Sequence, residues 1–101
     1  MMHFQVMKEK QAKIVFKRPD EGGRKKPPSS SPYYATTEID QGSIKFWSIV
    51  IYFDNVLRDG EYEAECKVCF LVNNAPYHIL DEVEELPVYE GPKQVGQIIL
   101  Y

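Results

Sequence analysis

The sequence predicts an all-β protein, a small antiparallel barrel or sandwich of six short strands. Segments rich in β-branched and aromatic residues recur along the chain, and turn signals separate them at intervals of about ten residues. No segment carries a convincing helical period. This regular spacing of short strands and turns is typical of small closed or two-layered β-domains.

The chain has 101 residues, enough for one domain with a single modest core. Hydrophobic residues make up 44% of it and aromatic residues 13%, which favours a folded domain over a disordered tail. We expect a lead-in segment over residues 1–10 and one β-domain over residues 11–101. The first residues lack the features of a secretory signal, and no apolar run reaches the roughly 20 residues that cross a bilayer, so we expect a cytoplasmic protein.

Alternation and composition predict the first three strands. Over residues 11–17 every second side chain is apolar, and Pro19 ends this strand because proline has no N–H for a central ladder. A second strand follows over residues 33–39. A third, over residues 43–53, is dense in β-branched and aromatic side chains and should be well buried.

The fourth strand, over residues 62–72, has the clearest alternation in the chain, with one apolar face and one face rich in glutamate. Cys69 and Leu71 interrupt the polar face, which predicts that another element covers this end of the strand. Two further strands are expected over residues 84–89 and 94–101. The conformation of residues between the fourth and fifth strands stays open, with a short helical turn as one interpretation.

Cys66 and Cys69 spell Cys-x-x-Cys, a spacing found in zinc sites and redox pairs. His3 and His78 show no spacing that would complete a zinc site, and residues three apart on a strand face opposite sides. Two cysteines also cannot form the dense disulfide framework of a small secreted domain. We therefore interpret both as ordinary strand residues and expect no metal.

No group of residues predicts catalysis. The acidic run over residues 81–85 has no partner residues spaced for a calcium loop, and it is typical of a solvated surface. The chain contains neither a Gly-x-Ser-x-Gly elbow nor a phosphate-binding glycine loop followed by lysine. We expect a protein that is not an enzyme and that uses no cofactor.

Charge is distributed unevenly along the chain, whose net charge is −3. Residues 1–35 contain eight Lys or Arg against three acids, whereas the remainder contains four against twelve. This split predicts a basic edge, although a net acidic chain has no general attraction to nucleic acid and a solvated surface would have the same composition. The expected basic edge consists of Lys17, Arg18, Arg24, Lys25 and Lys26.

The stretch Asp-Glu-Gly-Gly-Arg at residues 20–24 predicts an unusual turn, because a glycine pair permits positive φ and close backbone approach. Together with the strand at 12–16 and the Tyr-Tyr-Ala-Thr-Thr-Glu-Ile run at 33–39, this turn resembles the opening of domain 3, the C-terminal β-barrel of elongation factor Tu. Residues 89–99 are similar to the last hairpin of that barrel. The resemblance implies a six-stranded antiparallel β-barrel.

The resemblance also implies that Arg24, Thr36, Thr37 and Gly91 lie near the surface that the family offers to tRNA. Arginine supplies a bidentate fork for phosphate, and threonine hydroxyls or a bare glycine backbone accept close approach of ribose and phosphate. Ala35 stands where the family usually has an arginine, and these 101 residues contain no Walker-type glycine loop such as the family's nucleotide-binding domain carries. Turn chemistry and ordinary strand packing account for the same four residues without any ligand.

We expect a non-enzymatic binding module that docks a protein partner through the basic edge. A protein is favoured over RNA because a net acidic chain lacks the charge to hold a phosphate backbone by itself. RNA or tRNA binding through the same edge is the alternative, and an inhibitor or immunity-type protein is a further one. The oligomeric state stays open.

Overall fold

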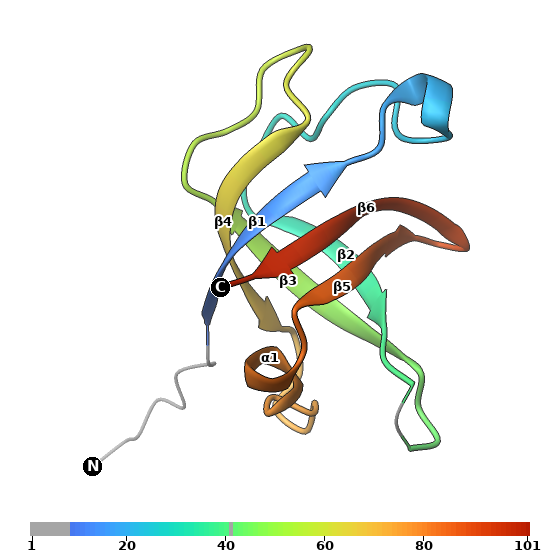
Figure 1. Cartoon of the computed structure of the whole chain (residues 1–101), viewed down its shortest axis with the longest axis vertical. Coiled ribbons are helices and arrows are strands. Elements are labelled where there is room, and N and C mark those ends of the chain that lie inside the picture. Colours follow the sequence, from blue (N-terminus) through green and yellow to red (C-terminus); the bar gives the residue numbers. More distant parts are fainter. Residues whose placement is uncertain (1–8, 41) are drawn as a thin grey trace.

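The computed structural model describes residues 9–40 and 42–101, which form a closed barrel of antiparallel strands (Figure 1). The strands are β1 (Lys10–Phe16), β2 (Tyr33–Glu38), β3 (Phe46–Phe53), β4 (Glu63–Phe70), β5 (Glu85–Glu90) and β6 (Lys93–Leu100). A 3-10 turn, η1 (Pro19–Glu21), follows β1, and one helical turn, α1 (Ile79–Glu82), precedes β5. The predicted small six-stranded antiparallel barrel is confirmed. The predicted lead-in falls outside the described residues, apart from its last two.

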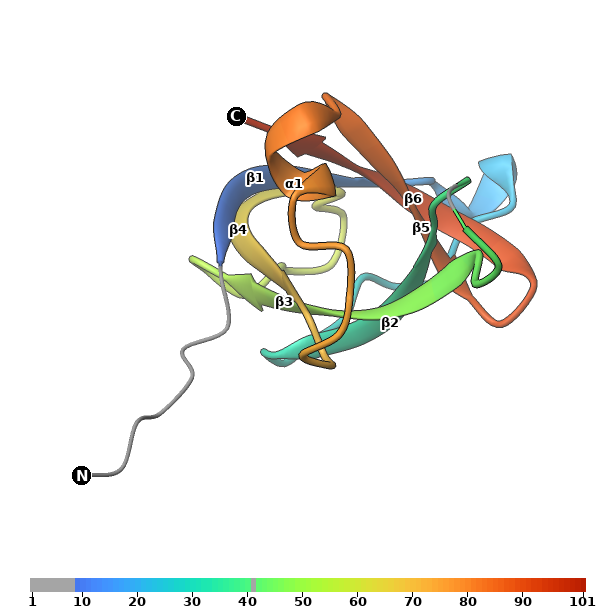
Figure 2. The same cartoon turned by 90° about the horizontal axis from the view of Figure 1, so that it is seen from below.

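Around the ring the strands follow the order β1, β4, β3, β2, β5, β6, and β6 pairs with β1 to close it (Figure 2). The two ends of the barrel sequence meet there, since the N–H of Tyr101 donates to the carbonyl of Gln11 at 3.3 Å. Every pair of neighbours is antiparallel. The order separates β1 from β2, although they are consecutive in the chain.

One of the six strand pairs is much weaker than the others. Strands β2 and β5 are joined at a single register position, where Thr36 lies opposite Tyr89. Continuing this register places Pro87 opposite Glu38, and proline has no N–H with which to extend the ladder. We call this junction the seam.

The core is built from the inward-facing side of every strand, as the alternation predicts. Burying each aliphatic side chain there stabilises the fold by about 1.5 to 3 kcal/mol relative to leaving it exposed. The largest fully buried aliphatic and aromatic side chains on the strands are Ile14, Ile49, Ile51, Val68, Phe70, Val88, Val95 and Ile98.

The segment between β4 and β5 closes one end of the barrel. Its helical turn α1 buries Ile79 and Leu80, and the ring of Tyr77 packs edge-on against Phe70 with centroids 5.4 Å apart. The short helical turn, one interpretation of this segment, is confirmed. No helix in the described ranges is long and apolar enough to span a membrane.

Strand β4 is shorter than predicted. It ends at Phe70, and both Leu71 and Val72 are exposed where the chain turns toward α1. The expectation that another element covers this end is therefore wrong for Leu71. Cys69, in contrast, is buried on the outer side of the strand.

Candidate functional site

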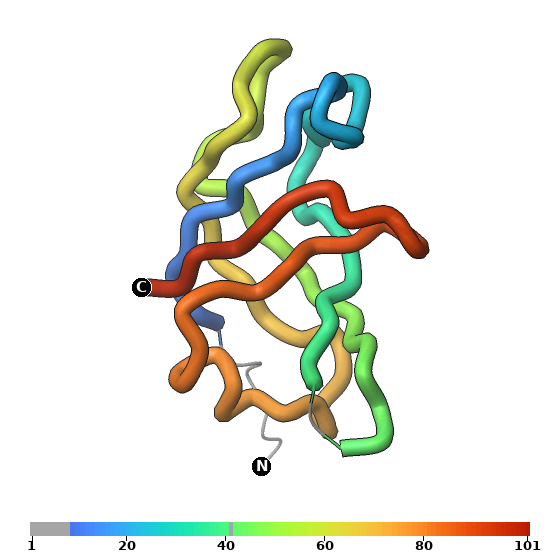
Figure 3. The backbone as a smooth tube through the Cα atoms, turned by 45° about the vertical axis from the view of Figure 1, so that its right-hand side comes forward, coloured from blue at the N-terminus to red at the C-terminus, as the bar shows by residue number. Residues whose placement is uncertain are grey.

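The turn after β1 is built from local backbone hydrogen bonds, and Figure 3 follows the chain through it to β2. The N–H of Arg18 donates to the Glu21 carboxylate at 2.8 Å, and the N–H of Gly23 donates to the Arg18 carbonyl at 3.0 Å. Gly22 has a φ of 87°, in the left-handed region that favours glycine. A Cβ on Gly23 would lie 2.0 Å from the carbonyl oxygen of Lys17, so both glycines are required for different reasons.

This turn delivers Arg24 to the β5–β6 hairpin. The guanidinium of Arg24 forms an ion pair with the Glu90 carboxylate, and its Nε donates to the carbonyl of Lys26 at 2.9 Å. The hydroxyl of Tyr33 donates to the same oxygen of Glu90. The Arg24 guanidinium also lies 5.8 Å from the centre of the Tyr33 ring, within cation–π range. Arg24 is thus oriented by contacts from both the hairpin and β2.

Tyr33 keeps its proton under ordinary conditions. Burial raises the pKa of its phenol well above the usual value, and the neighbouring Glu90 carboxylate raises it further. A neutral hydroxyl is what donates to the carboxylate, so the contact is maintained throughout the physiological pH range.

Cations surround an open hollow between the loop after η1 and the hairpin. The hollow has a volume of about 480 Å³ and is lined by Arg24, Lys25, Lys26, Glu90 and Lys93. The ammonium of Lys93 donates to the carbonyl of Gly23 at 3.1 Å, which ties the hairpin to the turn. Four cations thus face a single carboxylate, which Arg24 and Tyr33 already engage. We call this feature the basic hollow.

The structure divides the basic edge expected from the sequence. Arg24, Lys25 and Lys26 line the basic hollow, but Lys17 and Arg18 do not. Lys17 borders a different depression, beside Gly96 of β6. The guanidinium of Arg18 lies 5.0 Å from the ring centre of Tyr62, the residue that immediately precedes β4 in the chain.

The two threonines of β2 occupy different environments. Thr36 is half-buried at the seam, where its hydroxyl lies 3.5 Å from the carbonyl of Tyr89. Thr37 is 0% exposed, and its hydroxyl has no hydrogen-bond partner among the described residues. The expectation that Thr37 contacts a partner is therefore corrected, because the strand alternation points its side chain into the core.

Gly91 occupies the tip of the β5–β6 hairpin, next to Glu90. Its φ is 59°, and Pro92 follows it as the second residue of a two-residue loop. Only a turn with positive φ at its first central position alone accommodates this pair, which is the type II′ turn. Gly91 therefore leaves bare backbone beside the basic hollow.

The sequence did not indicate that Glu90, Lys93 and Tyr33 lie together beside Arg24. The run Glu-Gly-Pro-Lys at 90–93 signals a tight turn, which places the first and last residues of the run together. It carries no signal that this turn lies beside Arg24, since that contact depends on how the barrel closes.

The other chemical candidates remain separate from the basic hollow. Cys66 lies in the core, where burial raises the pKa of its thiol to about 12, and both cysteines are free. Asp81 in the acidic run pairs with Lys10 at 3.2 Å. Within residues 9–40 and 42–101, no three His, Cys, Asp or Glu side chains are grouped to hold a metal ion.

No protein-family model matches the chain, and no curated protein matches its sequence. The function is therefore inferred from the geometry of the site.

Proposed function

We propose that the protein is a non-enzymatic binding module that docks an acidic surface of a partner protein in the basic hollow. The observation that carries this proposal is the set of four cations around one open hollow, in which Glu90, the one carboxylate among the described lining residues, is already engaged. The chain as a whole has a net charge of −3, so this local excess of positive charge is distinctive. Complementary charge steers association and selects partners.

Lys25 and Lys26 are the residues best placed to contact the partner. Both side chains are exposed, and no ion pair in the described part of the chain involves either of them. Arg24 is instead held by Glu90, Tyr33 and a backbone carbonyl, so it contributes a cation of fixed position. A fixed group loses little conformational freedom on binding, which favours affinity.

The resemblance to domain 3 of elongation factor Tu supports the same proposal. In that family the barrel packs against neighbouring domains, so a barrel of this kind offers surfaces suited to docking. Arg24, which matches that family's motif, lines the basic hollow in this chain, and Gly91, which also matches, follows the lining residue Glu90 in the hairpin loop. An inhibitor or immunity-type protein would use the hollow in the same way, and the identity of the captured partner would reveal it.

Affinity capture from cell extract tests this function. The unaltered chain should recover one stoichiometric protein partner, and the double variant Lys25→Glu with Lys26→Glu should lose it. The matched control is Lys45→Glu with Arg58→Glu, which makes the same charge change at exposed positions outside the hollow. The proposal fails if nothing stoichiometric is recovered, or if the control loses the partner equally.

RNA binding is the second candidate, favoured by the bare Gly91 backbone beside the cations and by the resemblance to a tRNA-binding barrel. It predicts that binding of bulk tRNA weakens steeply as salt is added, because each phosphate contact releases counterions. The Lys25→Glu and Lys26→Glu pair should abolish that binding. Absence of tRNA binding at about 50 mM salt, where phosphate contacts are strong, would eliminate this candidate.

A further inference from the structure

The outer face of strands β4, β3 and β2 carries side chains that neither the core nor the basic hollow uses. The strand registers place Tyr34 opposite Val50 and Val50 opposite Cys69, so these three form a row across the face. In the next row, Tyr52 lies opposite Lys67. On the other side of the row, the N–H of Leu71 donates to the carbonyl of Ser48 at 3.0 Å.

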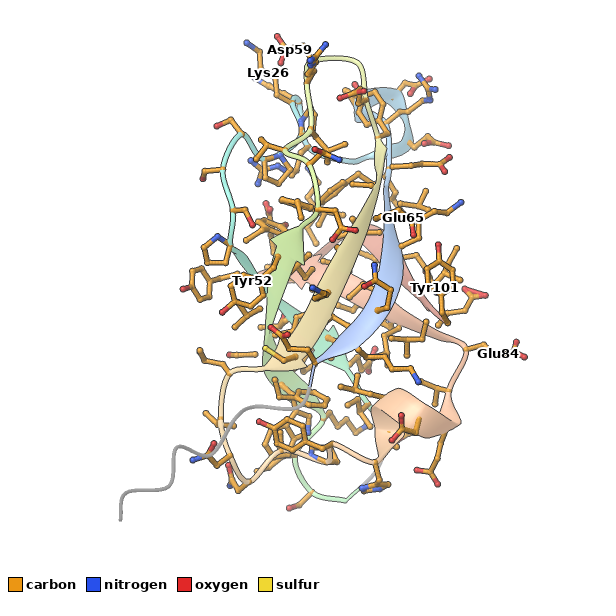
Figure 4. All side chains as sticks on the ribbon, turned by 90° about the vertical axis from the view of Figure 1, so that its left-hand side faces the viewer. Lys26, Tyr52, Asp59, Glu65, Glu84 and Tyr101 are labelled. Carbon is orange, nitrogen blue, oxygen red and sulfur yellow. The ribbon has the colours of Figure 1, made fainter. Side chains whose placement is uncertain are left out.

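These residues form an apolar patch with a buried floor and an exposed rim. Val50 and Cys69 are each 4% exposed, yet they lie outside the main core cluster. Tyr34, Tyr52 and Leu71 are 61%, 40% and 50% exposed. Figure 4 shows Tyr52 projecting away from the barrel, on the opposite side from Tyr101. We call Tyr34, Val50, Tyr52, Cys69 and Leu71 the outer patch.

The outer patch is bordered by a carboxylate, Glu9, and by an ammonium group, Lys67, near Cys69. Extending the β1–β4 register by one position places Glu9 opposite Cys69, at the end of the row. Burial raises the pKa of the Cys69 thiol and the Glu9 carboxylate raises it further, which agrees with this placement. Lys67 stands in the adjacent row, and no ion pair in the described ranges involves it.

We propose that the outer patch is the interface of a homodimer, in which a second copy of this chain covers it with the same surface. A two-fold interface is self-complementary. If one residue of the first copy contacts a different residue of the second copy, the same contact forms again with the two copies exchanged. A two-fold axis in the interface, midway between the Glu9 and Lys67 positions, sets Lys67 of each copy opposite Glu9 of the other. The tyrosines and Leu71 then form the apolar centre, and the two ion pairs lie at its border.

Two observations favour a second copy as the occupant. The patch has at its border both a carboxylate and a cation that forms no ion pair with the described residues, whereas a surface for a strongly acidic or basic partner would carry one sign. The barrel is also closed, so every described strand already has two neighbours and dimerisation by strand pairing has no open edge to use. Packing through a sheet face does not need an open edge.

This interface is distinct from the basic hollow, which is lined by the loop after η1 and by the hairpin. The dimer does not require the proposed docking function, and either can fail without the other. Separate substitutions therefore test them: Lys25 and Lys26 for docking, and the outer patch for self-association.

Sedimentation velocity of the full chain, from about 1 μM to about 1 mM, tests the dimer directly. We expect a reversible dimer. Tyr34→Arg or Tyr52→Arg should raise its dissociation constant by at least about tenfold, because aromatic residues contribute most of the binding energy at the centre of such interfaces. The matched control is Tyr101→Arg, since Tyr101 is 60% exposed on the other side of the barrel and should leave the dimer intact. Circular dichroism of each variant shows whether its fold is retained.

A charge exchange tests the geometry of the interface. Lys67→Glu and Glu9→Lys should each weaken the homodimer, because each sets like charges opposite one another. Mixing the two variants should restore association, since both ion pairs reform in the mixed dimer and native mass spectrometry would show that species in excess. The proposal is overturned if the unaltered chain stays monomeric over the whole concentration range, if Tyr101→Arg weakens it as much as Tyr52→Arg, or if mixing restores nothing.

Discussion

Gly23 is the residue with the least room for a side chain in the turn after β1. Because a Cβ there would overlap the Lys17 carbonyl, Gly23→Ala requires the backbone to move, and we expect a loss of about 3 kcal/mol in the free energy of unfolding. In Gly22→Ala the added Cβ would lie near no other atom within 4 Å. We expect this variant to lose only about 1 kcal/mol in the free energy of unfolding, because alanine is strained in the left-handed backbone conformation. Urea denaturation of both variants measures the difference. Equal losses would mean that strain alone, without overlap, explains the glycine pair.

The buried hydroxyl of Thr37 has no hydrogen-bond partner within residues 9–40 and 42–101, and this makes a stabilising substitution available. Thr37→Val keeps the shape of the side chain and removes an unsatisfied polar group, so we expect the free energy of unfolding to rise by about 1 kcal/mol. Thr36→Val is the comparison, since Thr36 contacts the Tyr89 carbonyl and should gain nothing. Thermal unfolding followed by circular dichroism checks both, and a loss of stability in Thr37→Val would show that the hydroxyl is satisfied.

These residues also show what single positions reveal before a structure exists. The glycine pair was predicted correctly as an unusual turn, because few residues other than glycine adopt positive φ or permit such close approach. Thr37 was not predicted as a core residue. Threonine is common in strands and more often exposed than buried, so its side-chain type gives no sign that it points into the core.

At the scale of elements, the contact between the loop after η1 and the β5–β6 hairpin depends on Tyr33. Its raised pKa means that the folded state favours the neutral phenol, so the unfolded chain loses this proton first. The contribution to stability is complete below the ordinary tyrosine pKa of 10.0 and declines as the pH rises above it. Between about pH 9 and about pH 11, the free energy of unfolding should therefore fall more for the unaltered chain than for Tyr33→Phe.

The comparison with Tyr33→Phe isolates one residue from several that titrate in the same direction. Tyr52 and Tyr77 also have raised pKa values, chiefly through burial, and they remain in both proteins. At neutral pH, Tyr33→Phe should cost about 1 kcal/mol through the lost hydrogen bond to Glu90. Guanidinium titrations at the two pH values provide the measurement, and identical pH dependence in the two proteins would contradict the assignment.

The elements themselves were largely predictable, whereas their contacts were not. Strands with one solvent-exposed and one buried face, such as β1 and β4, can be predicted from the alternation of polar and apolar residues. The pairing of Arg24 with Glu90 joins residues far apart in the chain, and it depends on the pairing of β6 with β1 and of β5 with β2, which brings the hairpin to the turn after β1. No local pattern encodes that neighbourhood, so half of the candidate site could not be found from the sequence.

At the scale of the whole molecule, the seam is where the barrel should open first. A junction held at one register position has few hydrogen bonds to break, whereas β1 and β4 are paired from Lys10 to Val15. We expect the amides of Thr36 and Tyr89 to exchange with solvent faster than that of Ile14. Amide hydrogen exchange followed by NMR checks this order, and uniform protection around the ring would contradict it.

The meeting of the first and last strands has a mechanical consequence. The start of β1 and the end of β6 lie at the same end of one antiparallel pair, with Ala12 opposite Leu100. A force pulling these two points apart acts across the strands, so it loads their hydrogen bonds one after another instead of all at once. The continuous core stabilises the barrel against heat, but the barrel should unfold at low force when β1 and β6 are pulled apart. Unfolding would begin with the separation of these two strands.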